Sequence, residues 1–210
     1  DQIFGGLAGA LLVDRGPDLP VAADRVLLIT DITLDSDGRV APVSTMDQMM
    51  GRQGELVLVN GQHQPAISAV PGRPQRWRLI NGCTSRVLPI RLADHQLTQV
   101  ALDGTFLPAP AVKDRVLLAP GNRADLIVRP EAAGRHELIT EASDRGRMPG
   151  MGGMGGMDGR STRTEPVTLA TLVTMGDPAA APLLPPSLPT ETLPAGPVTG
   201  RRQIAFQMGM

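Results

Sequence analysis

Short apolar runs rich in β-branched residues recur along this chain, and several end at a pair of residues that favours a tight turn. Asn-Gly follows the runs 55–59 and 76–80, and Asp-Gly follows the run 97–102. Asn, Asp and Gly tolerate the positive φ angles of tight turns, so these pairs mark strand ends. Many short strands at near-regular spacing, without a long amphipathic helix, predict an all-β sandwich or barrel. The predicted strands are 26–30, 34–40, 55–59, 76–80, 87–92, 97–102, 116–118, 124–128 and 136–140.

The segments outside this series predict connections to further structure. Residues 3–13 are apolar and interrupted by glycine, which predicts a buried strand with close backbone packing. Residues 14–20 hold two prolines and a glycine, as in a sharp connection, and the proline-rich residues 176–199 favour an extended, semi-rigid connector. Residues 44–50 predict one helical turn, and residues 202–207 predict the first strand of another domain. We therefore expect a segment of a longer protein.

Charge and apolar patterning restrict the kind of partner. The net charge is −1 at pH 7 and Lys113 is the only lysine, so no cluster of basic residues marks a nucleic-acid interface. The longest apolar run, 3–13, is about half of the ~20 residues that cross a bilayer, so no membrane span is expected. Arginines are spaced through the strand-like runs, which predicts a solvated sheet face. These arginines are Arg73, Arg76, Arg78, Arg86 and Arg91.

The residue types that bind copper or zinc do not form a recognisable motif. His63, His95 and His136 lie far apart in sequence, and each is predicted to be a structural side chain standing alone. A type 1 copper site needs a thiolate and two imidazoles, often with a weak axial Met. No His or Met follows Cys83 within one short loop, so Cys83 is predicted to be a small buried apolar side chain. No nucleophile or nucleotide-binding motif is present either.

Four methionines recur at every third position of a glycine-rich segment, residues 148–157. Glycine costs about 1 kcal/mol relative to Ala in a helix, so these methionines do not form a helical core stripe. Thioether sulfur is a soft ligand that favours Cu(I), so a flexible loop of this kind can wrap one such ion. A low-complexity loop without a ligand role has the same composition, and both interpretations remain open. The candidate metal residues are Met148, Met151, Met154 and Met157.

Several segments together resemble the second cupredoxin domain of bacterial multicopper oxidases. The most specific is RWRLINGCTSRVLPIRLADHQLTQVALDG at 76–104, and the others within the domain are LVLVNGQHQP at 56–65 and APGNRADLIV at 119–128. The resemblance implies a cupredoxin-like Greek-key β-sandwich over 25–175, with 148–159 as a Met/Gly-rich loop. It also implies that 1–13 is the last strand of a first cupredoxin domain and 14–24 a linker. Residues 176–200 then form a proline-rich linker, and 201–210 contain the first strand of a third domain.

The sequence LINGC and the methionine-rich stretch are most similar to the periplasmic cuprous oxidases of copper tolerance. Such enzymes oxidise Cu(I) and various phenols and reduce dioxygen to water, with type 1 copper and a trinuclear cluster. The family holds those copper atoms in its first and third domains, so no catalytic ligand is carried over to this chain. The resemblance implies a structural spacer whose partners are the flanking cupredoxin domains, in a periplasmic or extracellular protein.

Two alternatives accompany this expectation. A copper-free relative of the cell-division type shares the three-domain fold and acts by protein–protein contacts. A general laccase acts on phenols, and its methionine loop is incidental. The Met-Gly segment favours the cuprous oxidase, because a copper-free protein has no evident use for it.

Overall fold

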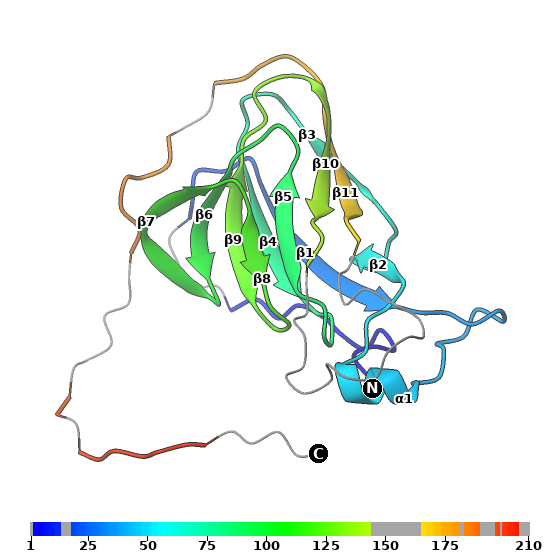
Figure 1. Cartoon of the computed structure of the whole chain (residues 1–210). Coiled ribbons are helices and arrows are strands. Elements are labelled where there is room, and N and C mark those ends of the chain that lie inside the picture. Colours follow the sequence, from blue (N-terminus) through cyan, green and yellow to red (C-terminus); the bar gives the residue numbers. More distant parts are fainter. Residues whose placement is uncertain are drawn as a thin grey trace.

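Two β-sheets pack face to face in the computed structural model, which describes residues 2–13, 18–143, 165–180, 183–189, 196–197 and 199–205. The predicted all-β sandwich is confirmed (Figure 1). The six-stranded sheet has the order β2 (Leu56–Val59), β1 (Ala23–Ile32), β4 (Gln75–Asn81), β9 (Arg123–Val128), β6 (Leu97–Leu102) and β7 (Thr105–Lys113). The five-stranded sheet has the order β3 (Ala66–Ala69), β11 (Val167–Thr174), β10 (Gly134–Thr140), β5 (Leu88–Leu92) and β8 (Val116–Leu118).

Most neighbouring strands are antiparallel, but each sheet contains one parallel pair. β1 runs parallel to β4, with Leu27 opposite Leu79, and β3 runs parallel to β11. Parallel neighbours cannot be joined by a tight turn, so the chain crosses from one sheet to the other between them. The connection from β2 through β3 to β4 makes such a crossing, because β3 belongs to the five-stranded sheet.

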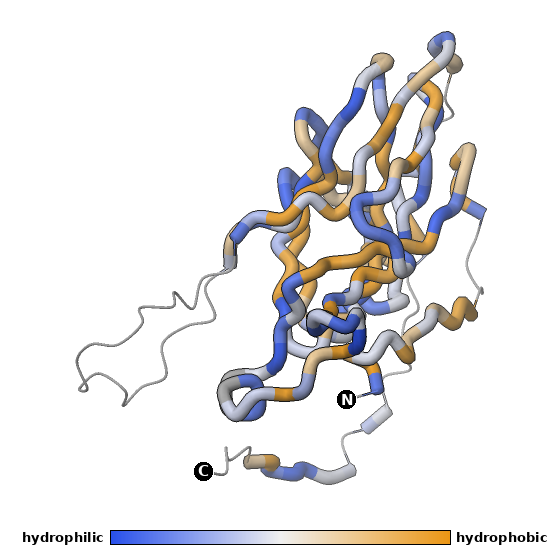
Figure 2. Tube along the Cα trace, turned by 90° about the vertical axis from the view of Figure 1, so that its right-hand side faces the viewer, coloured by the Kyte–Doolittle hydropathy of each residue, from blue (hydrophilic) through white to orange (hydrophobic). Residues whose placement is uncertain are grey.

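The main core lies between the sheets and is built from the alternate residues that face inward. Trp77 and Leu79 of β4 are completely buried, and so are Leu126 of β9 and Leu138 of β10. Successive side chains of a strand point to opposite faces, so an apolar residue at every second position lines one face. The alternation of hydrophobic and hydrophilic residues along the strands is visible in Figure 2.

The two Asn-Gly pairs adopt different structures. Asn60 and Gly61 have φ angles of 52° and 76°, and the Asn60 side chain accepts a hydrogen bond from Leu28 N at 2.9 Å. This turn closes only one bridge, between Val59 and Gln62, before the chain leaves for the other sheet. Asn81, in contrast, is the last residue of β4 and is completely buried. Only the first pair is therefore the tight turn that the dipeptide predicts.

The predicted helical turn is confirmed as α1 (Thr45–Met50). Ser44 caps it, because its hydroxyl accepts a hydrogen bond from Asp47 N at 3.1 Å. The Asp47 carboxylate accepts from Ser44 N at 3.0 Å, which completes a reciprocal capping box.

The apolar segment at the N-terminus forms no strand within the described chain, so the strand expected over 3–13 stays a prediction that requires a partner from outside these residues. Residues 2–6 form turns and residues 7–13 form no strand. Leu7 is 71% exposed and Leu11 is 89% exposed, whereas Phe4 is buried. A strand requires a neighbour for its backbone hydrogen bonds, and this segment has no such neighbour in the described chain. Figure 2 shows the segment outside the sandwich. Residues 201–205 likewise form no strand.

Three strands were missed from the sequence: β3, β7 and β11. β7 contains Pro108 and Pro110, which lack the N–H that an interior strand must donate. It lies at the edge of its sheet, where one side of the backbone needs no partner within the sheet. β3 is only four residues long and is also an edge strand.

A second, smaller apolar cluster covers part of the outer face of the six-stranded sheet. Its members on the sheet are Val100 of β6, Phe106 of β7 and Ile127 of β9. The remaining members come from the chain before β1 and from the proline-rich chain after β11: Leu19, Val21, Leu184 and Leu188. Part of the outer face is therefore covered by the two connectors that lead into and out of the sandwich.

Candidate functional site

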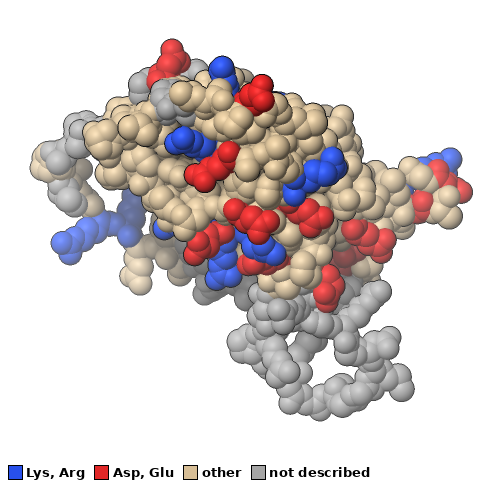
Figure 3. Space-filling view, turned by 90° about the horizontal axis from the view of Figure 1, so that it is seen from above, with Lys and Arg blue, Asp and Glu red and all other residues tan. Residues whose placement is uncertain are grey.

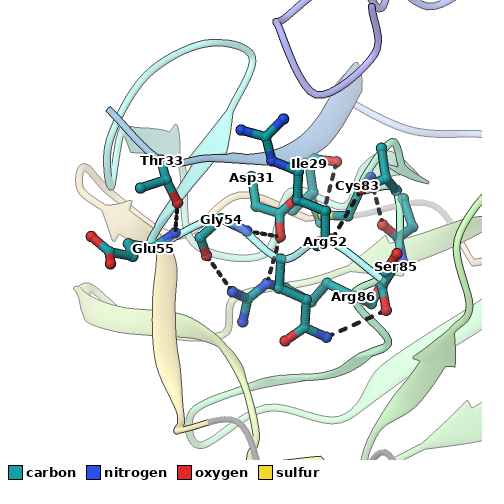
Figure 4. A network of polar contacts seen from close by, with 12 residues as sticks. Ile29, Asp31, Thr33, Arg52, Gly54, Glu55, Cys83, Ser85 and Arg86 are labelled. Atoms are coloured by element: carbon teal, nitrogen blue, oxygen red, sulfur yellow. Dashed lines mark hydrogen bonds and ion pairs between the residues drawn. The ribbon is translucent and has the colours of Figure 1, made fainter. Parts of the chain in front are cut away.

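A buried ion pair joins β1 to the loop before β5. Arg86 Nε donates to Asp31 Oδ2 at 3.0 Å, and Gly54 N donates to the same oxygen at 2.8 Å (Figure 4). Arg86 also donates to the Gly54 carbonyl. The Asp31 side chain is 1% exposed and that of Arg86 is 9% exposed. Gly54 lies so close to β1 that an added Cβ would overlap the backbone N of Ile32, which explains the glycine.

Asn81 organises the same loop from the end of β4. Its side-chain amide donates to the carbonyls of Arg86 at 2.8 Å and Leu118 at 2.9 Å. Its side-chain oxygen accepts from Cys83 N at 3.0 Å. A buried polar side chain that satisfies three backbone groups fixes the path of a loop without needing solvent. Asn81, Cys83 and Arg86 therefore belong to one connected structural unit.

Cys83 lies beside this ion pair with its thiol buried. Its Sγ is 3.8 Å from the carbonyl oxygen of Ile29. Burial raises the pKa of the Cys83 thiol well above its ordinary value, and the negative charge of Asp31 raises it further while Arg86 opposes the shift. A copper ligand must be a thiolate. The environment holds the thiol protonated, so the geometry supports the predicted role of Cys83 as a small buried side chain.

Phe4 ties the N-terminal segment to the same region. The guanidinium of Arg52 lies 3.6 Å from the centroid of the Phe4 ring, within the range of a cation–π contact. Arg52 also donates to the carbonyl of Ala41, and its own carbonyl accepts from Thr84 Oγ1 at 3.0 Å. This contact holds Phe4 although most of its neighbours in sequence are exposed.

The outer face of the six-stranded sheet carries a compensated charge cluster. Arg76 pairs with Asp125 of β9 and lies 3.7 Å from Asp24 of β1, and Arg78 donates to Asp24 at 2.9 Å. The side chains of Arg76 and Arg78 are only 10% and 13% exposed. The predicted solvated sheet face is therefore wrong for Arg76, Arg78 and Arg86, because each side chain is largely buried and paired with a carboxylate.

A cavity of about 410 Å³ lies against this charge cluster. It is bounded by the connector from Asp18 to Asp24 and by Arg76 and Arg78 of β4. Because both arginines are already paired with carboxylates, the cavity offers no free cationic group to an anionic ligand. Figure 3 shows that acidic and basic side chains are also interspersed on the upper face of the molecule.

The structure brings two of the three histidines together, which the sequence did not predict. His95 and His136 meet edge to face, with ring centroids 4.4 Å apart. His95 Nδ1 is 2.8 Å from the carbonyl of Ala93, and His136 Nδ1 is 3.4 Å from Asp94 Oδ2. His63 is exposed. These contacts support structural roles for His95 and His136, although neither stands alone.

The described residues do not fit a copper site. Among them, no three His, Cys, Asp or Glu side chains gather where they could hold a metal ion. Cys83 has a raised pKa, and its hydrogen-bonding partner is a backbone carbonyl rather than a histidine. Met148, Met151, Met154 and Met157 lie outside the described residues.

No helix in the described ranges is long and apolar enough to span a membrane.

Asp31 is a buried member of this site that the sequence patterns did not predict. It ends a strongly apolar run in β1, where an unpaired carboxylate would be costly to bury. A charged residue inside such a run, together with an arginine in the most specific segment, is the signal that a buried pair exists. Sequence alone does not say that these two residues meet, because they are 55 positions apart.

Known proteins with similar sequences include both oxidases and cell division proteins. A family model for multicopper oxidases matches residues 24–147. The cell division protein FtsP of Dickeya dadantii is 34% identical over 135 residues, which cover 60% of this chain and 28% of that protein. FtsP of Edwardsiella tarda is 29% identical over 211 residues, covering 97% of this chain and 43% of that protein. The chain thus spans less than half the length of these curated relatives.

Several solved structures with the same fold are multicopper oxidases. The laccase-like multicopper oxidase CueO from Ochrobactrum sp. matches with a TM-score of 0.63 and 25% identity, over 86% of this chain and 37% of that one. A multicopper oxidase from Campylobacter jejuni, described as a metallo-oxidase, matches with a TM-score of 0.65 and 24% identity, over 83% and 34%. At this level of identity the latter likeness shows the fold alone, a cupredoxin-like sandwich.

Proposed function

Because the chain belongs to the multicopper oxidase family, we propose that it is the middle domain of a three-domain oxidase and acts as a structural spacer. In this arrangement residues 1–13 complete the preceding cupredoxin domain and residues 201–210 begin the following one. The exposure of Leu7 and Leu11 supports this assignment, because a neighbouring domain would cover them. Residues 14–24 and 176–200 are then the linkers, and the parent protein is periplasmic or extracellular.

One observation supports the spacer role: the described side chains of the types that bind copper make local contacts within the sandwich instead of converging on a metal site. The Cys83 thiol is buried beside the Asp31–Arg86 pair, and His95 and His136 contact each other and neighbouring oxygen atoms. A ligand set for copper instead needs an accessible, converging group of side chains. The family's copper atoms would then be bound by the flanking domains, where they supply electron transfer and dioxygen reduction.

The reaction proposed for the parent protein is oxidation of Cu(I), of phenolic substrates, or of both, coupled to reduction of dioxygen to water. Membership of the family supports an oxidase, and copper tolerance is the biological role that we propose for it. The test is to purify the complete protein after copper supply and measure bound copper, the blue thiolate-to-copper absorption and dioxygen uptake with each substrate. We expect stoichiometric copper and uptake with at least one substrate.

The second candidate is a copper-free protein that acts in cell division by protein contacts. The curated relatives favour it, because they are cell division proteins at up to 34% identity. The same purification distinguishes the two candidates. A complete protein without copper, absorption or dioxygen uptake contradicts the oxidase and supports the second candidate.

For the methionine-rich segment we propose a role in collecting Cu(I), through the thioethers of Met148, Met151, Met154 and Met157. Replacing all four with Leu in the complete protein is expected to slow Cu(I) oxidation and leave phenol oxidation unchanged. Met175→Leu is the matched control, since Met175 is 63% exposed and lies outside the segment. Unchanged kinetics on Cu(I) in the fourfold variant would rule out this role.

A further inference from the structure

The proline-rich chain that leaves the sandwich, here called the exit connector (175–180 and 183–189), is attached to the body along its length. Met175 N donates to Ala69 O at 3.0 Å, Ala179 N donates to Pro71 O at 3.0 Å, and Leu188 N donates to Pro108 O at 3.0 Å. These contacts carry the chain from β11 across to β7, as Figure 1 shows. A connector with three separate backbone attachments is not a freely moving tether.

Gly72 supplies independent support for this path. It has a φ angle of 76°, and a Cβ at this position would overlap the carbonyl oxygen of Ala179. Gly72 N donates to Pro130 O at 2.7 Å, so the turn itself is also fixed. The absence of a side chain at Gly72, in the turn before β4, therefore allows the exit connector to contact this turn at Ala179.

The chain that leads into β1, here called the entry connector (18–22), is anchored to the same side of the molecule. Ala22 N donates to Pro74 O at 2.7 Å. Leu19 of the entry connector and Leu188 of the exit connector are 8% and 5% exposed. Both belong to the outer cluster that also contains Val100 and Ile127. One apolar cluster therefore joins both connectors to the sheet.

We propose that the two connectors form a clamp, in which the outer cluster couples the position where the chain enters the sandwich to the position where it leaves. This inference deepens the proposed spacer role and rests on it for its biological meaning. A spacer holds two flanking domains in one relative orientation only if the points where the chain enters and leaves it stay at a fixed position relative to each other. The outer cluster fixes these two points relative to each other, because it contains Leu19 of the entry connector and Leu188 of the exit connector. It lies outside the main core.

The test is hydrogen–deuterium exchange on the complete parent protein, comparing the wild type with Leu188→Ala. Removing a buried leucine side chain leaves a cavity and lowers local stability, and local opening governs amide exchange. We expect exchange to accelerate on the order of tenfold or more at the amide of residue 188, which donates to Pro108 O, and also at the amides of Val21 and Ala22, which donate to Leu19 O and Pro74 O. Exchange in β4 and β10 is expected to stay unchanged. The matched control is Leu183→Ala, because Leu183 lies in the same connector and is 83% exposed.

The reciprocal variant, Leu19→Ala, is expected to accelerate exchange at the Leu188 amide, which donates to Pro108 O. If each variant loosens only its own connector, the clamp is contradicted, because the two segments then pack independently. If β4 and β10 are also affected, the cluster is part of the global fold and the clamp is equally contradicted. The result does not depend on copper, so a copper-free parent protein would overturn the oxidase while leaving the clamp standing.

Discussion

The indole Nε1 of Trp77 donates a hydrogen bond to Oε1 of Gln75 at 3.0 Å, with Trp77 completely buried and Gln75 nearly so. The same oxygen accepts from Arg25 Nε at 3.1 Å, and Gln75 Nε2 donates to Ser68 O at 2.8 Å. Because β4 carries Gln75 and β3 carries Ser68, this side chain ties the six-stranded sheet to the five-stranded sheet. The sandwich is therefore joined by polar contacts as well as by its apolar core.

Replacing Gln75 with Leu is expected to destabilise the chain by about 1–3 kcal/mol, because it leaves the buried Trp77 N–H without an acceptor. Gln75→Glu loses the amide that donates to Ser68 O, but it keeps an acceptor for Trp77 and its charge lies against the Arg25 guanidinium, so it is expected to cost less. Trp77 is the only tryptophan, so its fluorescence during urea unfolding reports the free energy directly. Equal stability of the Leu variant and the wild type would show that the contact contributes nothing.

Replacing Arg86 with Met is expected to lower the free energy of unfolding by about 3–5 kcal/mol, because Asp31 is left buried without its partner. Arg39→Met is the control, since Arg39 is 81% exposed and its contact with Asp37 is 3.8 Å long. A surface pair of this kind contributes at most about 1 kcal/mol. Urea unfolding of both variants measures the difference. A similar cost for the two would contradict the importance of the buried pair.

Stability is expected to fall as the pH rises above about 9, in part because of Cys83. Burial raises the pKa of this thiol above its ordinary value of 9.0, so the folded state keeps a proton that the unfolded state releases. The unfolded state then binds fewer protons, and the free energy of unfolding decreases with pH. Few other groups titrate there, because the chain has no tyrosine and one lysine.

The variant Cys83→Ala tests this prediction through the slope of unfolding free energy against pH rather than its absolute value. We expect a shallower decline above pH 9 than in the wild type. A thiol reagent supplies a second measurement, since the buried Cys83 should react only when the protein unfolds. Parallel slopes, or rapid labelling of the folded protein, would contradict the burial of the thiol.

Replacing Asn81 with Asp is expected to destabilise the chain far more than Asn60→Asp. At position 81 the change removes the amide that donates to Arg86 O and Leu118 O and places a carboxylate against two carbonyls. At position 60 the side chain is exposed, so water compensates for the lost donor. Thermal unfolding at neutral and acidic pH checks this, because protonating the introduced carboxylate restores one donor and should recover part of the stability.

Most strands of the sandwich were predicted from the sequence, and the segments where prediction and structure differ have physical explanations. The strands around 76–80, 97–102 and 124–128 were found because apolar residues alternate there and turn residues bound them. β7 was missed because its two prolines are unfavourable inside a sheet, and only its position at an edge makes them acceptable. The segment 3–13 forms no strand within the described chain, because apolar composition does not provide the backbone partner that a strand needs.

The sequence by itself determined the all-β fold, the single thiol and the resemblance to multicopper oxidases, because these depend on local residue patterns and on one stretch of specific motif. Only the tertiary structure decided which charged groups are buried, that His95 meets His136, and that Leu19 and Leu188 share a cluster. These contacts join residues that are 41 to 169 positions apart in the sequence. No short-range pattern encodes them, since they depend on the crossing connections that place distant strands side by side.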